Sequence, residues 1–356
     1  MYTKHFNLNK LPFENVPDPA FFFEKGDYSQ IRNRIKNSLI AGRGLIVVTG
    51  PIGSGKTTLS QMIKTDYSNS SDNLQLIWMA EPPNNSKDLY LFVSQELGLK
   101  PLTIERVFIL RDIRETLLKF NSTGKKCLII IDESHLMDKG LLEGVRILNN
   151  LEEGPTKLLQ ILLLGQMEIL ETLKDPEMKP FIQRISALEM IGKLNADKIR
   201  QYISHRIKMA GGQPTIFTET GWEAVVMASG TAGGIPRVIN SLCDRALNMA
   251  FEKGKSAVDI DDIFESAEDL SIAAELFHYR RTIKNKEKNP KASLIEEKPI
   301  TPLLPHAPIA AAKKPDKSKQ RITQPADSAD IKAAQRLFLF SLGILALSTI
   351  FYFQRL

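Results

Sequence analysis

A short glycine-rich run carries the spacing of a phosphate-binding loop. It consists of Gly50, Pro51, Ile52, Gly53, Ser54, Gly55, Lys56 and Thr57, which fits G-x-x-x-x-G-K-[ST]. An apolar run precedes it, and a helical pattern that includes Thr58 follows it. Glycines let backbone amides turn toward phosphate oxygens, and the helix start adds partial positive charge. We therefore predict that residues 50–58 bind a nucleoside triphosphate, with Lys56 at its β- and γ-phosphates and Thr57 on Mg²⁺.

A second apolar run, 127–131, leads directly into Asp132 and Glu133. Carboxylates at the C-terminal end of a central strand lie where α/β sheets bind ligands. We expect Asp132 to complete the Mg²⁺ shell and Glu133 to orient or deprotonate an attacking water. The alternative is a helix-capping aspartate followed by a solvated glutamate.

Two further polar residues occur where a triphosphate site needs them. Gln166 follows the apolar run 161–164 and is expected to contact the γ-phosphate or its water. Arg237 begins a helical pattern after Gly234 and could close a lid onto the nucleotide. Local hydrogen bonding by Gln166, and capping or packing by Arg237, are the alternatives. The chain has no Asn-Lys-x-Asp run of the kind that reads guanine, so ATP is expected.

The spacing of apolar segments indicates the elements that position these residues. Nearly continuous apolar runs at 45–48, 74–78, 127–131 and 158–164 predict buried strands, and helical patterns follow at 56–66, 86–97, 103–120 and 139–151. This alternation predicts an α/β P-loop core, with a parallel sheet flanked by helices. Beyond residue 192 only helices are expected, at 196–210, 219–228, 235–252 and 259–277.

Composition excludes several classes of protein. The 356 residues are 25% charged and 43% hydrophobic, which excludes collagen, a coiled-coil rod and a wholly disordered chain. Residues 1–279 hold 32 lysines and arginines against 35 aspartates and glutamates, whereas residues 280–336 hold 14 against 6. The basic charge therefore belongs to a tail, and nucleic acid is not an expected partner. The two cysteines, Cys127 and Cys243, form no zinc or disulfide pattern and are expected to be reduced core thiols.

The C-terminal part has the composition of a linker followed by an apolar segment. Residues 289–330 contain seven prolines, and residues 337–353 contain no charge. That length lies at the lower edge of the ~17–25 residues of a transmembrane helix. Lysines and arginines before it predict a single membrane span with residues 1–336 in the cytoplasm. A buried core helix is the alternative for 337–353, and the basic linker could be solvated or lie on anionic lipid.

These patterns together predict four regions. Residues 1–192 form the nucleotide-binding α/β domain, with an N-terminal segment at 1–26. Residues 193–279 form a small all-α lid, residues 280–336 a disordered linker and residues 337–353 a C-terminal transmembrane helix. The polar and aromatic N-terminus lacks the apolar stretch of a secretory signal.

The chain resembles the AAA+ ATPases of the general secretion pathway protein A (ExeA) family over residues 1 to about 270. The family's opening motif is matched by Met1-Tyr2, Phe6, Leu8, Pro12-Phe13, Pro17-Asp18-Pro19 and Phe21, and its G-x-P-R-x-I-N motif by Gly234, Pro236, Arg237, Ile239 and Asn240. The phosphate loop and Asp132-Glu133 match as well.

The resemblance implies roles for three residues and an assembly. Gln166, in the Gly165-Gln166 motif, is implied to be sensor 1, and Arg237 to be sensor 2. Arg184, in Gln183-Arg184-Ile185, is implied to be a finger inserted into a neighbouring subunit's site, which implies a homo-oligomeric ring or arc. An ordinary intramolecular ion pair is the alternative for Arg184.

The resemblance also suggests what the ATPase serves. We expect a membrane-tethered ATPase with partners in a type II secretion, pilus or polysaccharide-export system. The family's periplasmic cell-wall-binding part has no counterpart here, as in shorter MshM-like relatives, so a cell-wall role is not expected. A TniB-like DNA-transposition ATPase and an ATP-bound scaffold with little turnover are the alternatives.

Overall fold

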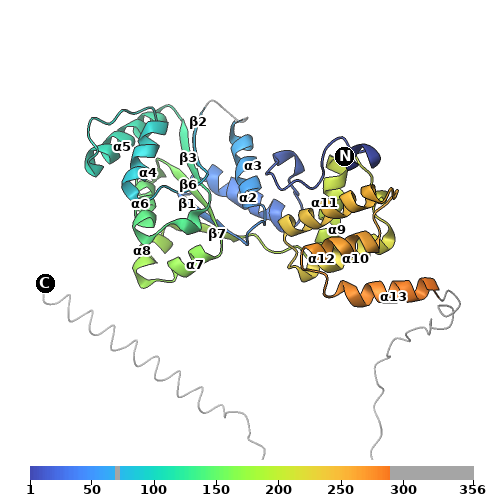
Figure 1. The fold of residues 1–356 in the computed structure, drawn as a ribbon. Coiled ribbons are helices and arrows are strands. Elements are labelled where there is room, and N and C mark those ends of the chain that lie inside the picture. Colours follow the sequence, from blue (N-terminus) through green and yellow to red (C-terminus); the bar gives the residue numbers. More distant parts are fainter. Residues whose placement is uncertain (69–72, 289–356) are drawn as a thin grey trace, which may run out of the picture. The chain divides into compact units, whose positions relative to one another are not determined.

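A parallel β-sheet forms the centre of the N-terminal half of the chain. The computed structural model describes residues 1–68 and 73–288 (Figure 1). Among these residues five strands form one sheet in the order β2-β3-β6-β1-β7, with every neighbouring pair parallel. The strands are β1 (Leu45–Thr49), β2 (Leu74–Met79), β3 (Lys126–Ile131), β6 (Gln160–Gly165) and β7 (Ile185–Met190). This confirms the α/β class with a parallel sheet.

Helices cover both faces of this sheet because successive side chains of each strand alternate between the faces. Ile46 and Val48 of β1 pack on the side of α2 (Asp27–Ile40) and α3 (Lys56–Ser68). Leu45 and Val47 pack on the opposite side, which is covered by α4 (Ser86–Glu96), α5 (Arg106–Ser122) and α6 (Lys139–Asn149). Strands buried on both faces explain the nearly continuous apolar runs of the sequence. Shorter elements complete this half: η2 (Ser134–Leu136), the hairpin β4 (Glu152–Glu153) and β5 (Thr156–Lys157), α7 (Glu168–Leu173), η3 (Pro176–Met178) and α8 (Lys179–Ile182).

The second half of the described chain is helical. It contains α9 (Ala196–Met209), η4 (Pro214–Ile216), α10 (Glu219–Thr231), α11 (Pro236–Glu252), α12 (Ile260–Asp269) and α13 (Leu276–Lys288). The prediction of one helix over 259–277 is wrong, because α12 ends before Ser271, whose φ is +59°. The amide of Ile272 donates to the carbonyl of Ala267 at 2.8 Å, a bond across the end of α12 that closes the helix.

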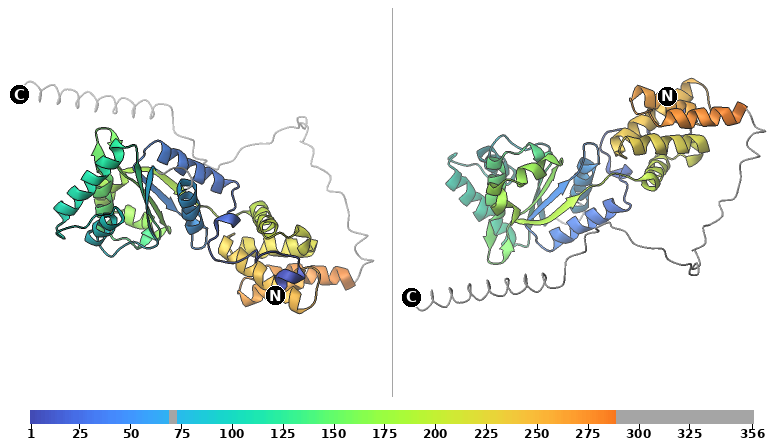
Figure 2. Two further views of the ribbon diagram at one scale, coloured as in Figure 1. Left: turned by 90° about the horizontal axis from the view of Figure 1, so that it is seen from above. Right: turned by 90° about the horizontal axis from the view of Figure 1, so that it is seen from below.

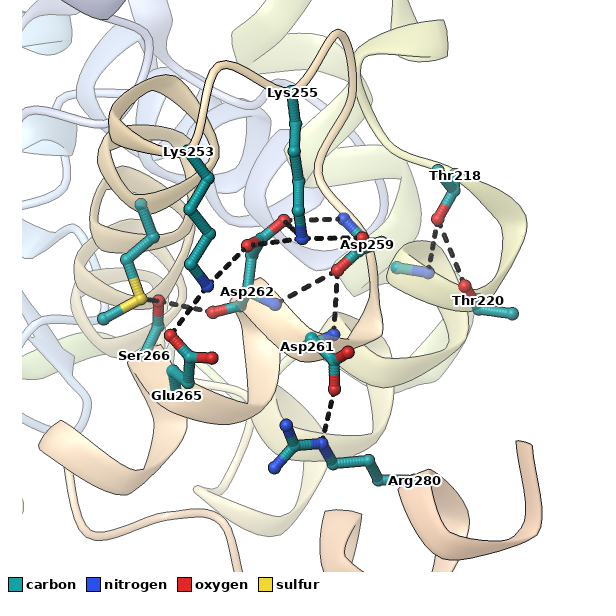
Figure 3. A network of polar contacts seen from close by, with 12 residues as sticks. Thr218, Thr220, Lys253, Lys255, Asp259, Asp261, Asp262, Glu265, Ser266 and Arg280 are labelled. Carbon is teal, nitrogen blue, oxygen red and sulfur yellow. Dashed lines mark hydrogen bonds and ion pairs between the residues drawn. The ribbon is translucent and has the colours of Figure 1, made fainter. Parts of the chain in front are cut away.

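A buried ionic network holds the start of α12 against the end of α11 (Figure 3). Asp262 is fully buried and accepts hydrogen bonds from the ammonium groups of Lys253, at 3.0 Å, and Lys255, at 2.9 Å. Asp259 caps α12 through the amides of Asp261 and Asp262. The carboxylates therefore satisfy both the helix start and the lysines of the preceding turn.

The N-terminal segment lies against the helical half. It contains α1 (Tyr2–His5) and η1 (Pro19–Phe21). The hydroxyl of Tyr2 donates to Asp244 of α11 at 2.6 Å, and Phe13 is 1% exposed. Both views of Figure 2 show the N-terminus beside the helices of this half.

The sequence patterns missed β7 and α2. β7 is an edge strand with alternating exposed and covered residues, including Leu188 and Met190, both about half exposed, so it lacks a continuous apolar run. No helix among the described residues is long and apolar enough to cross a membrane. The predicted span 337–353 and most of the predicted linker lie outside the described residues.

Candidate functional site

The phosphate-binding loop connects β1 to α3 at the C-terminal edge of the sheet. Gly53 and Gly55 have φ values of +76° and +91°, which residues with a Cβ atom rarely adopt. A Cβ atom on Gly53 would also lie 2.5 Å from Cβ of Arg237. The sequence motif thus supplies glycine both for the turn and for the close approach of α11.

Lys56 is the first residue of α3 and is only 6% exposed. Its ammonium donates to the carbonyls of Gly50, at 2.9 Å, and Pro51, at 3.0 Å. These two bonds join the end of the loop to its beginning and stabilise its turn. Burial lowers the pKa of Lys56, and the nearby carboxylates of Glu133 and Asp132 oppose that shift. A buried ammonium at this position is a strong binding group for an anion.

Asp132 and Glu133 follow β3, and they occupy different environments. Asp132 is 2% exposed, forms a hydrogen bond with Thr57 and accepts the amide of Glu133 at 2.9 Å. Burial raises the pKa of Asp132, whereas these two hydrogen bonds lower it. A carboxylate beside a threonine hydroxyl is an oxygen pair of the kind that Mg²⁺ prefers. The residues present therefore fit the predicted metal.

Glu133 adopts a left-handed backbone conformation, with φ of +51°. This conformation is uncommon for a residue with a Cβ atom and is often found at functional sites. The turn places the Glu133 side chain in the cavity wall, where it is 38% exposed. Its Oε2 lies 3.4 Å from Nδ1 of His135, a residue to which the sequence assigned no chemistry.

One cavity of about 140 Å³ gathers most of the predicted site. Gln166, directly after β6, lines this cavity. Arg237 lines it from the first turn of α11, and the Arg237 amide donates to the carbonyl of Gly53 at 3.2 Å. The predicted residues that line the cavity are Ile52, Gly53, Gly55, Lys56, Thr57, Thr58, Glu133, Gln166 and Arg237.

The remaining predicted residues lie outside the cavity wall. Asp132 lies behind it, where it contacts Thr57. Ser54 lines the neighbouring cavity, and Gly50 and Pro51 contribute the carbonyls that bind Lys56. Arg184 is exposed between α8 and β7, and its side chain forms no hydrogen bond or ion pair with the described residues.

Sequence reasoning missed a second group that lines the cavity. The N-terminal residues Glu14, Asn15, Val16 and Pro17 line it, as do Tyr202, Arg206 and Asn240 of the helical half. Asn240 belongs to a motif of the family resemblance, but no role was attached to it. The i, i+4 spacing of Tyr202 and Arg206 on α9 is a signal that could have paired them.

A smaller apolar cavity adjoins the first. It is lined by the rings of Phe21, Phe22, Phe23 and Tyr28, and it shares Tyr202 and Arg206 with the first cavity. The hydroxyl of Tyr28 donates to the carbonyl of Ser54 at 3.0 Å, which fixes this aromatic wall to the phosphate-binding loop. An anion-binding loop beside an aromatic pocket suits a nucleotide, with its phosphates in one part and its base in the other.

The chain is similar to known proteins in both sequence and fold. Residues 40–173 match a family described as an AAA domain. General secretion pathway protein A from Aeromonas hydrophila is 31% identical over 274 residues, which cover 76% of this chain and 49% of the relative. Over that span this chain is ExeA-like. The type IV pilus retraction ATPase PilT of Pseudomonas aeruginosa is 27% identical over 173 residues, 48% of this ExeA-like chain and 37% of PilT. The ExeA-like chain thus spans about half, or less, of the curated relatives it matches.

Solved structures show the same fold at low identity. The ORC2 protein of Aeropyrum pernix, solved as ADPNP-ADP complexes, has a TM-score of 0.54 and 15% identity, with coverage of 73% of the ExeA-like chain and 71% of ORC2. Cdc6p of Pyrobaculum aerophilum has a TM-score of 0.55 and 14% identity, with coverage of 71% of each chain. These similarities show that residues of both halves together adopt the AAA fold.

Proposed function

We propose that this ExeA-like protein binds ATP with Mg²⁺ and hydrolyses it. The observation that carries the proposal is one cavity into which four separate elements bring Lys56, Glu133, Gln166 and Arg237. A buried cation, a carboxylate, an amide and an arginine are the groups that phosphoryl transfer to water requires.

Each residue has a part in the proposed reaction. Lys56 and Arg237 offset the negative charge of the triphosphate, and Gln166 orients the water. Glu133 accepts a proton as the water oxygen bonds to the γ-phosphorus and the bond to ADP breaks, which yields ADP and inorganic phosphate. Thr57 and Asp132 would hold Mg²⁺, which supplies neutralising charge at the phosphates.

We also propose which cellular system uses the energy of ATP hydrolysis. The names of the matched relatives, a general secretion pathway protein and a pilus retraction ATPase, support work for a type II secretion or pilus system, and we include a polysaccharide-export system in the proposal. We further propose a homo-oligomer completed by Arg184, and a single membrane span at 337–353 that tethers the cytoplasmic residues 1–336 to the bacterial inner membrane.

Calorimetry and turnover on two variants test the site. Lys56→Ala should abolish measurable binding of ATP and ADP, because it removes the buried ammonium that faces the phosphates. Glu133→Gln should bind ATP with near wild-type affinity but turn it over about 10²-fold or more slowly, because the amide cannot accept the proton. Wild-type protein that binds neither nucleotide would contradict the proposal.

Turnover also separates the proposal from the scaffold alternative. A scaffold would bind ATP tightly and show the same negligible rate in wild type and in Glu133→Gln. A Glu133→Gln protein that hydrolysed ATP at an undiminished wild-type rate would show that Glu133 is not the base.

A further inference from the structure

Residues 12–17, here called the N-terminal strap, connect the helical half to the phosphate-binding loop. Before the strap, the amide of Asn9 donates to the carbonyl of Ala210, at the end of α9, at 2.8 Å. After it, the chain reaches Tyr28, whose hydroxyl is bonded to the loop residue Ser54. Residues 14–17 of the strap line the cavity although they are largely exposed. Any ligand in the cavity therefore lies against the strap.

Arg206 of α9 holds the backbone of the strap. Its Nε donates to the carbonyl of Pro12 at 2.5 Å, and its Nη2 donates to the carbonyl of Glu14 at 3.1 Å. Arg206 is 8% exposed, and its guanidinium carbon lies 4.9 Å from the centre of the Phe21 ring. A buried arginine whose donors are directed at two backbone carbonyls fixes the course of that segment.

A chain of buried side chains continues from Arg206 to the strap. Nη1 of Arg206 donates to the hydroxyl of Tyr202 at 3.0 Å, and that hydroxyl donates to Oδ1 of Asn240 at 2.9 Å. Nδ2 of Asn240 then donates to Oδ1 of Asn15 in the strap at 3.2 Å. Tyr202 and Asn240 are 5% and 4% exposed, so an undocked strap would leave buried polar groups unpaired.

We propose that Arg206, Tyr202 and Asn240 are positioning residues that couple nucleotide binding to docking of the N-terminal strap on the helical half. The inference rests on the proposed function, because it places ATP in the cavity. All three side chains line that cavity, yet their polar atoms bond the strap and one another. A nucleotide that contacts strap and lid together stabilises the docked strap, and by linkage the docked strap strengthens nucleotide binding.

Hydrogen exchange of the strap and ATP affinity test the coupling in full-length protein. Tyr202→Phe keeps the ring but removes the hydroxyl that joins Arg206 to Asn240. Asn15→Ala removes the strap's side of the network at an exposed position and leaves the core untouched. Tyr279→Phe is the matched control, because it removes a tyrosine hydroxyl that bonds Glu223 away from the cavity.

In wild type and in Tyr279→Phe, a non-hydrolysable ATP analogue should slow exchange of the amides in residues 12–17. Tyr202→Phe and Asn15→Ala should lose most of that protection and bind ATP about five- to tenfold more weakly, the effect of about one lost hydrogen bond. Unchanged affinity and protection in Asn15→Ala would overturn the coupling, whatever the stability of Tyr202→Phe.

The same experiment distinguishes the two proposals. Wild-type protein that resembles Lys56→Ala and binds no nucleotide would contradict the proposed function and the coupling with it. Wild-type protein that binds ATP while the strap exchanges at an unchanged rate would contradict the coupling alone.

Discussion

At the scale of single residues, each of three buried ionisable side chains has a hydrogen-bond or ion-pair partner. Lys56 is held by two carbonyls of its own loop, and Asp132 by Thr57 and the following amide. Asp262 lies in the helical half and is fully buried between Lys253 and Lys255. Lys56 lines the ligand cavity and Asp132 lies behind it, but Asp262 serves the fold alone, so its removal tests stability without touching the site.

We predict that Asp262→Ala lowers the free energy of unfolding by about 2 kcal/mol, because it removes a buried acceptor of two ammonium groups and a cap of the α12 start. The loss stays moderate because both lysines are about one-third exposed and can turn to water. Urea unfolding measures it. Glu265→Ala, which removes the half-exposed second partner of Lys253, should cost under about 1 kcal/mol. Equal effects of the two substitutions would contradict the importance of burial.

At the scale of elements, the junction between the two halves depends on one glycine. Gly234 has φ of +61°, and a Cβ atom there would lie 2.0 Å from the carbonyl oxygen of Leu194. The amide of Leu194 donates to the carbonyl of Gly234 at 3.0 Å. This close backbone contact sets where α11 begins, and the first turn of α11 carries Arg237 into the cavity.

Gly234→Ala should therefore lower both stability and ATP affinity, with a loss of at least about 2 kcal/mol in unfolding free energy from the clash and the strained φ. Gly230→Ala is the matched control: Gly230 lies in α10 with nothing within 4 Å of an added Cβ atom. That change should stabilise by up to about 1 kcal/mol. Thermal unfolding with and without ADP measures both effects, and a stabilised Gly234→Ala protein would argue against the close contact.

At the scale of the whole molecule, Arg184 lies outside the cavity of its own chain, and the proposed span 337–353 lies outside the described residues. Arg184 is exposed beside the edge strand β7, and its side chain has no hydrogen-bond or ion-pair partner in the part of the chain that the structure describes. Arg184 concerns the proposed assembly of subunits, and the span concerns the proposed attachment to the membrane. Experiments on the intact protein test both.

If Arg184 completes a neighbour's site, the ATPase rate per subunit should rise with protein concentration in wild type. In Arg184→Ala the rate should stay low, about 10²-fold or more below the assembled wild type, and flat over the same dilution series. Arg114→Ala, an exposed arginine on α5, is the control and should behave as wild type. A wild-type rate per subunit that does not change with dilution would remove the proposed role.

Cell fractionation tests the tether. The full chain should sediment with the inner membrane and resist extraction by high salt, because an apolar span is held by burial in lipid rather than by charge. A chain without residues 333–356 should move to the soluble fraction. Salt-extractable wild-type protein would instead indicate that the basic residues 280–336 make the membrane contact.

The sequence alone predicted the parallel sheet and the phosphate-binding loop, because both depend on local patterns: apolar runs, glycine spacing, and a carboxylate directly after a strand. It missed β7, since this edge strand has exposed side chains and no continuous apolar run. It also continued one helix past the end of α12 to residue 277, since one left-handed serine leaves no trace in helical periodicity. Only the tertiary structure brought Asn15 to Asn240 and Arg206 to Pro12, residues about 200 positions apart in sequence. Side-chain contacts at such separation are set by how the helices pack, which no short segment encodes.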